Sequence, residues 1–116
     1  MTLIGSLPNL KVLYLFNYAF EGPEWNSMEG EFPRLEELVI SYSNLVWWRA
    51  ENIHFPNLKL LRLSSMNKLE EIPLSIGDIA TLKMIQLDCC KESAKDSAKQ
   101  IAEEQQYNGN EVFKFM

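Results

Sequence analysis

Leucines recur along this chain in a nine-residue phrase that is written four times. It reads LPNLKVLYL from Leu7, FPRLEELVI from Phe32, FPNLKLLRL from Phe55 and IATLKMIQL from Ile79, so that successive starts lie 25, 23 and 24 residues apart. A period of this length indicates stacked copies of one structural unit.

The last part of each phrase alternates apolar and variable positions, which predicts a short strand with one buried face. The spacing L-x-x-L-x-L is typical of leucine-rich repeats. We therefore expect an α/β fold of the leucine-rich-repeat solenoid class, with parallel strands on its concave face and irregular, 3₁₀ or helical return segments. The predicted inward positions are Leu10, Leu13, Leu15, Leu35, Leu38, Ile40, Leu58, Leu61, Leu63, Leu82, Ile85 and Leu87.

The return segments carry a second set of apolar columns. Seven residues before successive phrases stand Trp25, Trp48 and Ile72, which we expect to stack inside the core. In the stretch NKLEEIPLSIGDIATL, helical or 3₁₀ spacing points four side chains inward: Leu69, Ile72, Ile76 and Ile79.

One residue before that aromatic column, the sequence has Glu24, Trp47 and Glu71. Two glutamates predict a solvent-facing column, so Trp47, which is close to Arg49, is a candidate exposed contact. The alternative is that Trp47 folds onto a neighbouring loop.

The two ends of the chain differ. Residues 3–10 align without gaps on residues 75–82, so the chain starts inside a repeat. We expect either the C-terminal piece of a longer solenoid or a truncated product. The predicted division is about four repeats over residues 1–90, the first incomplete, followed by a capping helix and tail over 91–116.

The second half of this prediction rests on ESAKDSAKQIAEEQQ, which reads as a helix with Ser93 as N-cap and Asp96 three residues on. Its predicted docking face is Ala94, Ala98, Ile101, Ala102 and Gln105. Gly109 is the predicted helix end. The final EVFKFM is either a last short strand that docks Phe113 and Phe115 or a frayed tail.

Three segments together, the repeated F-P-x-L-x-x-L-x-L, LEEIPLSIGDIATLKMIQLDCC and SAKDSAKQIAEEQQYNGN, resemble one family. They are similar to the C-terminal end of plant coiled-coil nucleotide-binding leucine-rich-repeat disease-resistance proteins, in particular the late blight resistance-like proteins of the nightshade family. The resemblance implies an intracellular immune receptor. In such receptors the repeats sense pathogen effectors or restrain a nucleotide switch, and activation leads to defence and hypersensitive cell death.

One motif of the full-length family is missing from this chain. No G-x-x-x-x-G-K-[ST] phosphate loop is present. The ADP or ATP binding of the full-length family is therefore not carried over, and we expect no cofactor here.

The composition of the chain bears on which class of partner it binds and in which cellular compartment it works. Sixteen acidic against eleven basic residues disfavour a nucleic-acid binder. The apolar runs are too short to span a bilayer, and residues 1–10 lack a secretory signal pattern. The adjacent Cys89 and Cys90 rarely reach disulfide geometry, so we expect reduced thiols and a cytoplasmic protein. Peripheral membrane contact through partners stays open.

The chain offers few residues that could carry catalysis or bind a metal. Cys90 takes the N/C position that follows L-x-x-L-x-L, where a small buried side chain bonds a loop carbonyl. His54 is the single histidine, which makes a metal site improbable, and a Cys89–His54 nucleophile pair lacks an orienting third group. We therefore predict no catalytic, metal or cofactor-binding residue and no enzymatic activity.

The strand positions between the buried leucines form the predicted binding surface. An apolar patch rimmed by Glu37, Arg62 and Asp88 has the composition of a protein interface. The candidate residues are Val12, Tyr14, Phe16, Glu37, Val39, Tyr42, Leu60, Arg62, Met84, Gln86 and Asp88.

Three protein partners fit this surface: a pathogen effector, a guarded host protein, or the receptor's own upstream domains, in which case the contact is autoinhibitory. The alternative function is a stand-alone scaffold or regulatory repeat protein unrelated to immunity.

Overall fold

The computed structural model describes residues 9–16, 24–26, 32–51, 54–107 and 114–115. In chain order these form β1 (Val12–Phe16), β2 (Glu24–Asn26), β3 (Glu37–Ser41), β4 (Trp47–Arg49), β5 (Leu60–Ser64), the 3₁₀ helix η2 (Leu74–Asp78), β6 (Met84–Asp88), α2 (Glu92–Tyr107) and β7 (Lys114–Phe115).

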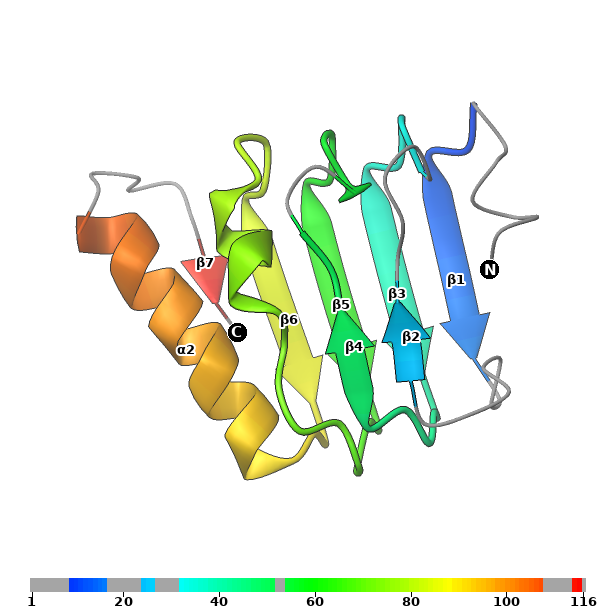
Figure 1. Ribbon diagram of the computed structural model, residues 1–116, viewed down its shortest axis with the longest axis vertical. Helices are drawn as coiled ribbons and strands as arrows, with labels where there is room; N and C mark the ends of the chain where they lie inside the picture. Colours follow the sequence, from blue (N-terminus) through cyan, green and yellow to red (C-terminus); the bar gives the residue numbers. More distant parts are fainter. Residues whose placement is uncertain (1–8, 17–23, 27–31, 52–53, 108–113, 116) are drawn as a thin grey trace.

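The larger sheet is parallel throughout and has the order β1-β3-β5-β6-β7 (Figure 1). Val12 pairs with Glu37, Glu37 with Leu60 and Leu60 with Met84. These offsets of 25, 23 and 24 residues equal the spacing of the leucine phrases. The four predicted strands and their parallel pairing are confirmed. The short strands β2 and β4 form a second parallel sheet.

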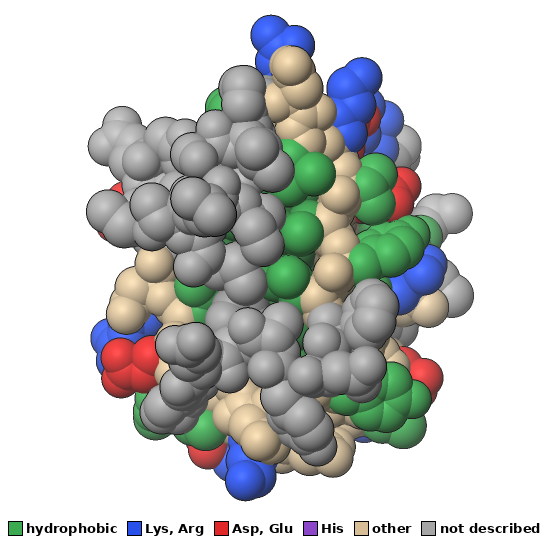
Figure 2. Space-filling view, turned by 90° about the vertical axis from the view of Figure 1, so that its right-hand side faces the viewer, with side chains coloured by type: hydrophobic (Ala, Val, Ile, Leu, Met, Phe, Trp, Pro, Cys, Tyr) green, Lys and Arg blue, Asp and Glu red, His purple; other side chains and the backbone are tan. Residues whose placement is uncertain are grey.

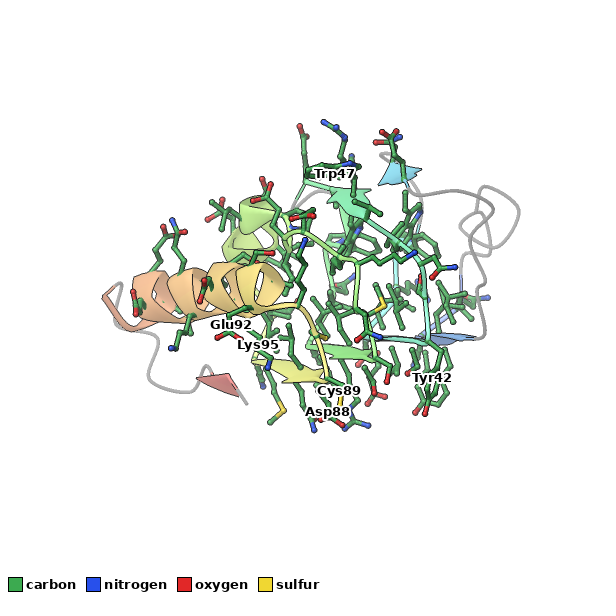
Figure 3. The ribbon with its side chains drawn as sticks, turned by 90° about the horizontal axis from the view of Figure 1, so that it is seen from below. Tyr42, Trp47, Asp88, Cys89, Glu92 and Lys95 are labelled. Atoms are coloured by element: carbon green, nitrogen blue, oxygen red, sulfur yellow. The ribbon has the colours of Figure 1, made fainter. Side chains whose placement is uncertain are left out.

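The core lies between the larger sheet and a layer made of β2, β4 and η2, with α2 beside the β6–β7 end (Figures 1 and 3). Ten of the twelve predicted inward strand positions are buried. Leu10 and Leu87 also pack against the core, but they are only partly buried, so the prediction of full burial is wrong for these two. Leu10 precedes the edge strand β1, and Leu87 lies beyond the two residues of β6 that pair with β7. The return-segment positions Leu69, Ile72, Ile76 and Ile79 are buried as predicted.

Aromatic rings fill the core between β2, β4 and the strand entries. Trp25 and Trp48 are buried and stacked, with ring centroids 5.4 Å apart, as predicted for this column. Phe32 and Phe55 form a second stack, also at 5.4 Å. Trp25 meets Phe32 edge to face at 6.2 Å. Offset-stacked and edge-to-face contacts are the favoured aromatic geometries. The repeat period places equivalent aromatic residues next to one another in the core.

Helix α2 is fixed to the preceding segment by polar and apolar contacts. The Ser97 hydroxyl accepts a hydrogen bond from the Ile72 N–H at 2.9 Å and donates one to the Ala94 carbonyl at 2.7 Å. The Gln105 amide donates to the Gly77 carbonyl. At Gly77 a Cβ would come within 2.9 Å of Ile101 Cγ2, so any larger residue requires the Ile101 side chain or α2 to shift.

The predicted docking face of α2 is confirmed. Ala94, Ala98, Ile101 and Ala102 are buried, and Gln105 is half-buried.

The predicted N-cap is wrong. The N–H of Lys95 donates to the Lys91 carbonyl, so α2 begins at Glu92 and Ser93 lies in its first turn. At the C-terminal end, Phe115 belongs to β7, whose backbone pairs with β6. The last segment is therefore a strand at Lys114–Phe115, while Gly109 and Phe113 lie outside the described residues.

The described residues contain no helix long and apolar enough to cross a membrane. The leucine-rich-repeat solenoid class and its division at residues 90 and 91 stay predictions from the sequence.

Candidate interaction surface

One face of the larger sheet points away from the core. Its side chains alternate with the buried leucines along β3 and β5, as the pleat of a strand requires. The strand register sets them in three rows. We call this surface the outer sheet face; its described side chains are Val12, Glu37, Leu60 and Met84 in the first row, Tyr14, Val39, Arg62 and Gln86 in the second, and Ser41, Ser64 and Asp88 in the third. The predicted Phe16 belongs to the third row by its backbone, and its side chain lies outside the described residues.

Apolar side chains on the outer sheet face are open to solvent at its β1 end. Tyr14 is 56% exposed and Val12 is 45% exposed. Val39, Leu60 and Met84 are half-buried. Figure 2 looks onto the β1 end, and large hydrophobic side chains stand out along its right-hand edge beside acidic and basic ones. Apolar and charged side chains thus lie side by side at this end of the face, and its role as a binding surface stays a prediction.

Arg62 is the exposed charge in the middle of this face. It pairs in register with Val39 on one side and Gln86 on the other. Its Nε–H donates to Gln86 Oε1 at 3.1 Å. The sequence predicted the neighbours but not this bond, which orients the guanidinium along the second row. The bond uses one of the five guanidinium donors, and the other four take no part in it.

The entry edge of the strands carries an ion pair. Lys59 Nζ lies 3.0 Å from Glu36 Oε1, and both residues directly precede a strand. The hydrogen bond from Lys59, followed by the Coulomb attraction of that same ammonium, lowers the pKa of the Glu36 carboxyl below its usual range. This edge is therefore charged on both sides of the β3–β5 contact at neutral pH.

At the exit edge, β3, β5 and β6 are each followed directly by a left-handed residue. Tyr42 and Ser65 have φ 54° and Cys89 has φ 53°, and none is a glycine. The N–H of Tyr42 still donates to Ser64 O at 3.0 Å, and that of Ser65 to Asp88 O at 2.8 Å. The ladder thus runs one residue past β3 and β5. Tyr42 is 59% exposed and lies on the same side of the molecule as Asp88 and Cys89 (Figure 3).

Trp47 lies on the opposite side of the molecule, in the layer of β2 and β4 (Figure 3). It is in register with Glu24, and it forms a bridge to Glu71. Its side chain is 42% exposed, so the predicted exposure of this column is confirmed. A contact role for Trp47 stays a prediction.

The thiols and the histidine are far apart in the fold. His54 precedes β5, where its Nδ1 accepts the Glu51 N–H at 3.2 Å, whereas Cys89 follows β6. Parallel strands of five residues separate the two edges by roughly 15 Å, so the Cys89–His54 pair considered from the sequence does not form. The described residues hold no group of three or more His, Cys, Asp or Glu placed to bind a metal.

Cys90 is buried, and its thiol donates to the Leu63 carbonyl at 3.5 Å. This is the structural role predicted for the N/C position. Burial raises the pKa of the Cys90 thiol above its usual range, which keeps it protonated as a donor.

Comparison with known proteins identifies relatives of this chain. No protein-family model matches it. The putative late blight resistance protein homologue R1B-11 of Solanum demissum is 38% identical over 115 residues, which is 97% of this chain and 9% of the relative. The putative homologue R1B-13 of the same species is 36% identical over 115 residues, which is 97% of this chain and 10% of that relative.

The chain is a homologue of part of the late blight resistance proteins. The late blight resistance protein R1-A of Solanum demissum is 40% identical, over 85% of this chain and 8% of its own length. The resemblance seen in the sequence is thereby confirmed. The chain spans about a tenth of the length of each of these three relatives, so the activity of a whole resistance protein is not established for it by the match.

Proposed function

We propose that this chain is the protein-interaction part of an intracellular plant immune receptor, built from repeats of a leucine-rich-repeat solenoid. It contributes to effector sensing or to autoinhibition, and through them to defence and hypersensitive cell death. It binds protein, works in the cytoplasm and carries no catalytic activity. The names of its relatives as resistance proteins support the immune role.

The observation that carries the proposal is the outer sheet face. Tyr14, Val12 and Arg62 are exposed on the same face of a parallel sheet, although a sheet face turned permanently to water is expected to be polar. Tyrosine and arginine are among the residues enriched at the energetic centres of protein interfaces. A partner that covers this face removes the apolar side chains from water and leaves Glu37 and Asp88 at the rim.

The partner with the simplest access is the remainder of the receptor. Relatives are several times longer than this chain, so other parts of the same polypeptide are held close to the face at high effective concentration. Such a contact is autoinhibitory when an effector or a guarded host protein competes for it. The same residues therefore serve sensing and restraint.

A binding experiment tests the proposal. The chain, immobilised, is mixed with the R1B-11 homologue from which the matching segment has been deleted, and the retained protein is quantified. We expect retention by the chain, and a loss of at least about tenfold in affinity for Arg62→Glu, because truncated interface centres cost on the order of 2 kcal/mol. Lys99→Glu makes the same charge change on the exposed side of α2 and is the matched control.

Circular dichroism checks that both variants are folded. Equal retention of Arg62→Glu, Lys99→Glu and the unchanged chain contradicts the assignment of this face. No retention of the unchanged chain contradicts the autoinhibitory contact.

A further inference from the structure

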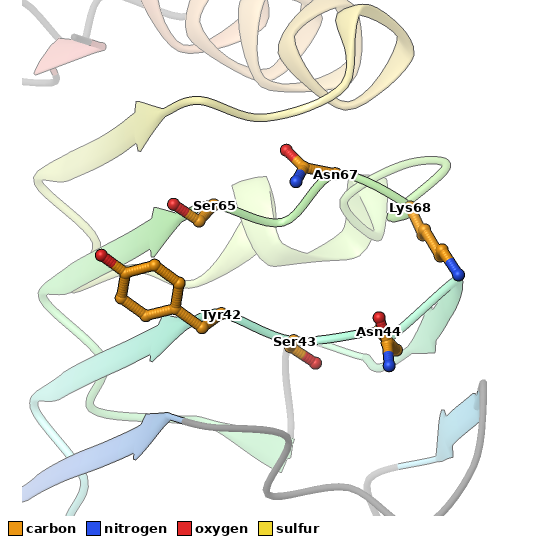
Figure 4. A pocket seen from close by; sticks show the side chains of 6 residues that line it. All are labelled: Tyr42, Ser43, Asn44, Ser65, Asn67 and Lys68. Carbon is orange, nitrogen blue, oxygen red and sulfur yellow. The ribbon is translucent and has the colours of Figure 1, made fainter.

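A polar hollow opens where β3 and β5 end, between the two loops that leave these strands (Figure 4). Its volume is about 210 Å³, which suits a side chain or a small charged group. The lining consists of Tyr42, Ser43 and Asn44 from the first loop and Ser65, Asn67 and Lys68 from the second. We call it the β3–β5 loop hollow.

The two loops that border the hollow differ in the number of residues. Ser41 pairs with Ser64 at an offset of 23 residues, but Trp47 bridges Glu71 at an offset of 24. The second loop is therefore one residue longer than the first between the same two levels of the fold. Both loops also leave their strand through a left-handed residue, Tyr42 and Ser65. The two loops therefore differ in length where the hollow lies between them.

The lining is rich in donors and lacks acids. Hydroxyl and amide groups can donate hydrogen bonds from five of its side chains, and Lys68 adds an ammonium. None of the six side chains carries a carboxylate. Such a set favours an oxygen-bearing anion over a cation.

Lys68 also forms no ion pair with any of the described residues. Lys59 is paired with Glu36, Lys91 with Glu70 and Lys95 with Glu92, whereas no carboxylate lies within ion-pair distance of Lys68 among the residues described. Its side chain is exposed, as are those of Asn44 and Asn67. An exposed cation without an ion pair among the described residues thus lies at this hollow.

The hollow continues the outer sheet face. Tyr42 and Ser65 directly follow the third row of that face, at Ser41 and Ser64. In the close view the Lys68 side chain extends toward the Asn44 loop, while Tyr42 stands at the strand side (Figure 4). A partner lying across the strands therefore reaches the hollow with a side chain at its edge.

We propose that the β3–β5 loop hollow binds a carboxylate side chain, from Asp or Glu, of the protein that docks on the outer sheet face. Lys68 supplies the charge, and the amides of Asn44 and Asn67 supply hydrogen bonds. This inference rests on the proposed function for its biological use. The binding chemistry itself is measured on the chain alone, so that the two can fail separately.

The experiment titrates the ¹⁵N-labelled chain with the acidic dipeptide acetyl-Asp-Glu-amide and follows the side-chain amide signals of Asn44 and Asn67 by nuclear magnetic resonance. The neutral acetyl-Asn-Gln-amide is the control ligand, and inorganic phosphate is a second anion. Lys68→Gln is the test variant. Lys99→Gln, which removes an exposed charge from α2, is the matched control.

We expect the acidic dipeptide to shift both amide signals, with an affinity at least fivefold weaker in Lys68→Gln and unchanged in Lys99→Gln. Equal shifts with the neutral dipeptide, or no dependence on Lys68, overturn the site. Stronger binding of phosphate than of the dipeptide overturns the carboxylate assignment. If the dipeptide binds here and the receptor remainder is not retained by the chain, the hollow stands and the proposed function fails.

Discussion

The indole rings of Trp25 and Trp48 are stacked, with centroids 5.4 Å apart and planes only 6° from parallel. They occupy equivalent places in successive repeats, since β2 and β4 pair in register at these two residues. The stack therefore reports directly on the periodicity of the chain. It also makes Trp48 a structural residue, although the adjacent Trp47 has the same chemistry.

Replacing the two adjacent tryptophans should have opposite consequences. Trp48→Ala removes a buried ring from the aromatic core, and we expect a loss of about 3–5 kcal/mol in the free energy of unfolding. Trp47→Ala removes a side chain that is 42% exposed, and we expect a loss of about 1 kcal/mol or less. Urea unfolding of both variants measures the difference. Equal losses would show that the register of β4 is wrong.

Gly77 and Ile101 should be energetically coupled. Gly77→Ala places a methyl group against Ile101, and overpacking of this kind costs about 1–3 kcal/mol. In an Ile101→Ala background the two nearest carbons, Cγ2 and Cγ1, are gone and only Cβ stays, at 3.6 Å, so the same glycine substitution should cost little. Thermal unfolding of the two single variants and the double variant closes a mutant cycle. An additive result would mean that α2 does not lie against η2 at this point.

Ser97 and Ser93 provide a matched pair on α2. Ser97→Ala leaves the Ile72 N–H without its acceptor, and an unsatisfied buried donor costs about 1–3 kcal/mol. Ser93 is exposed within the first turn, and Ser93→Ala should change stability by about 0.5 kcal/mol or less. Chemical denaturation compares the two. A larger loss at Ser93 than at Ser97 would restore Ser93 as the helix cap.

The Glu36–Lys59 pair should make stability depend on acid pH. Because Lys59 lowers the pKa of Glu36 in the folded chain, the contribution of the pair is fully present above the ordinary glutamate pKa of the unfolded chain. It is lost as pH falls through the folded-state pKa. Carboxyl titration by nuclear magnetic resonance should show the Glu36 pKa rising toward its usual range in Lys59→Met. Lys83→Met, at the corresponding place before β6, is the control, and an equal rise there would contradict the pairing.

The repeat period explains why most of the fold was predictable. A buried column needs one apolar side chain per repeat, so Trp25, Trp48 and Ile72 could be aligned by counting alone. The pairing register of β1, β3, β5 and β6 followed from the same count of residues per repeat. The partial burial of Leu10 and Leu87 was missed because it depends on the ends of the sheet rather than on the period.

The local polar geometry was less predictable. Ser97 reaches a backbone N–H 25 residues away in sequence, and no local pattern encodes that contact. The sequence predicted which residues lie in each row of the exposed surface. It did not predict the hydrogen bonds between them, such as the one from Arg62 to Gln86. The β3–β5 loop hollow depends on one extra residue and on left-handed backbone at Tyr42 and Ser65, where the sequence offers no glycine to indicate it.

The central claim is that the outer sheet face is where this chain meets another protein, and methyl signals measured by nuclear magnetic resonance test it most directly. Val39, Leu60 and Met84 report on that face, and Leu74, which is 43% exposed in η2 on the other side of the core, is the internal control. On addition of the R1B-11 homologue lacking the matching segment, we predict shifts or broadening at the first three and an unchanged Leu74. Perturbation of Leu74 with Val39, Leu60 and Met84 unmoved would contradict the account.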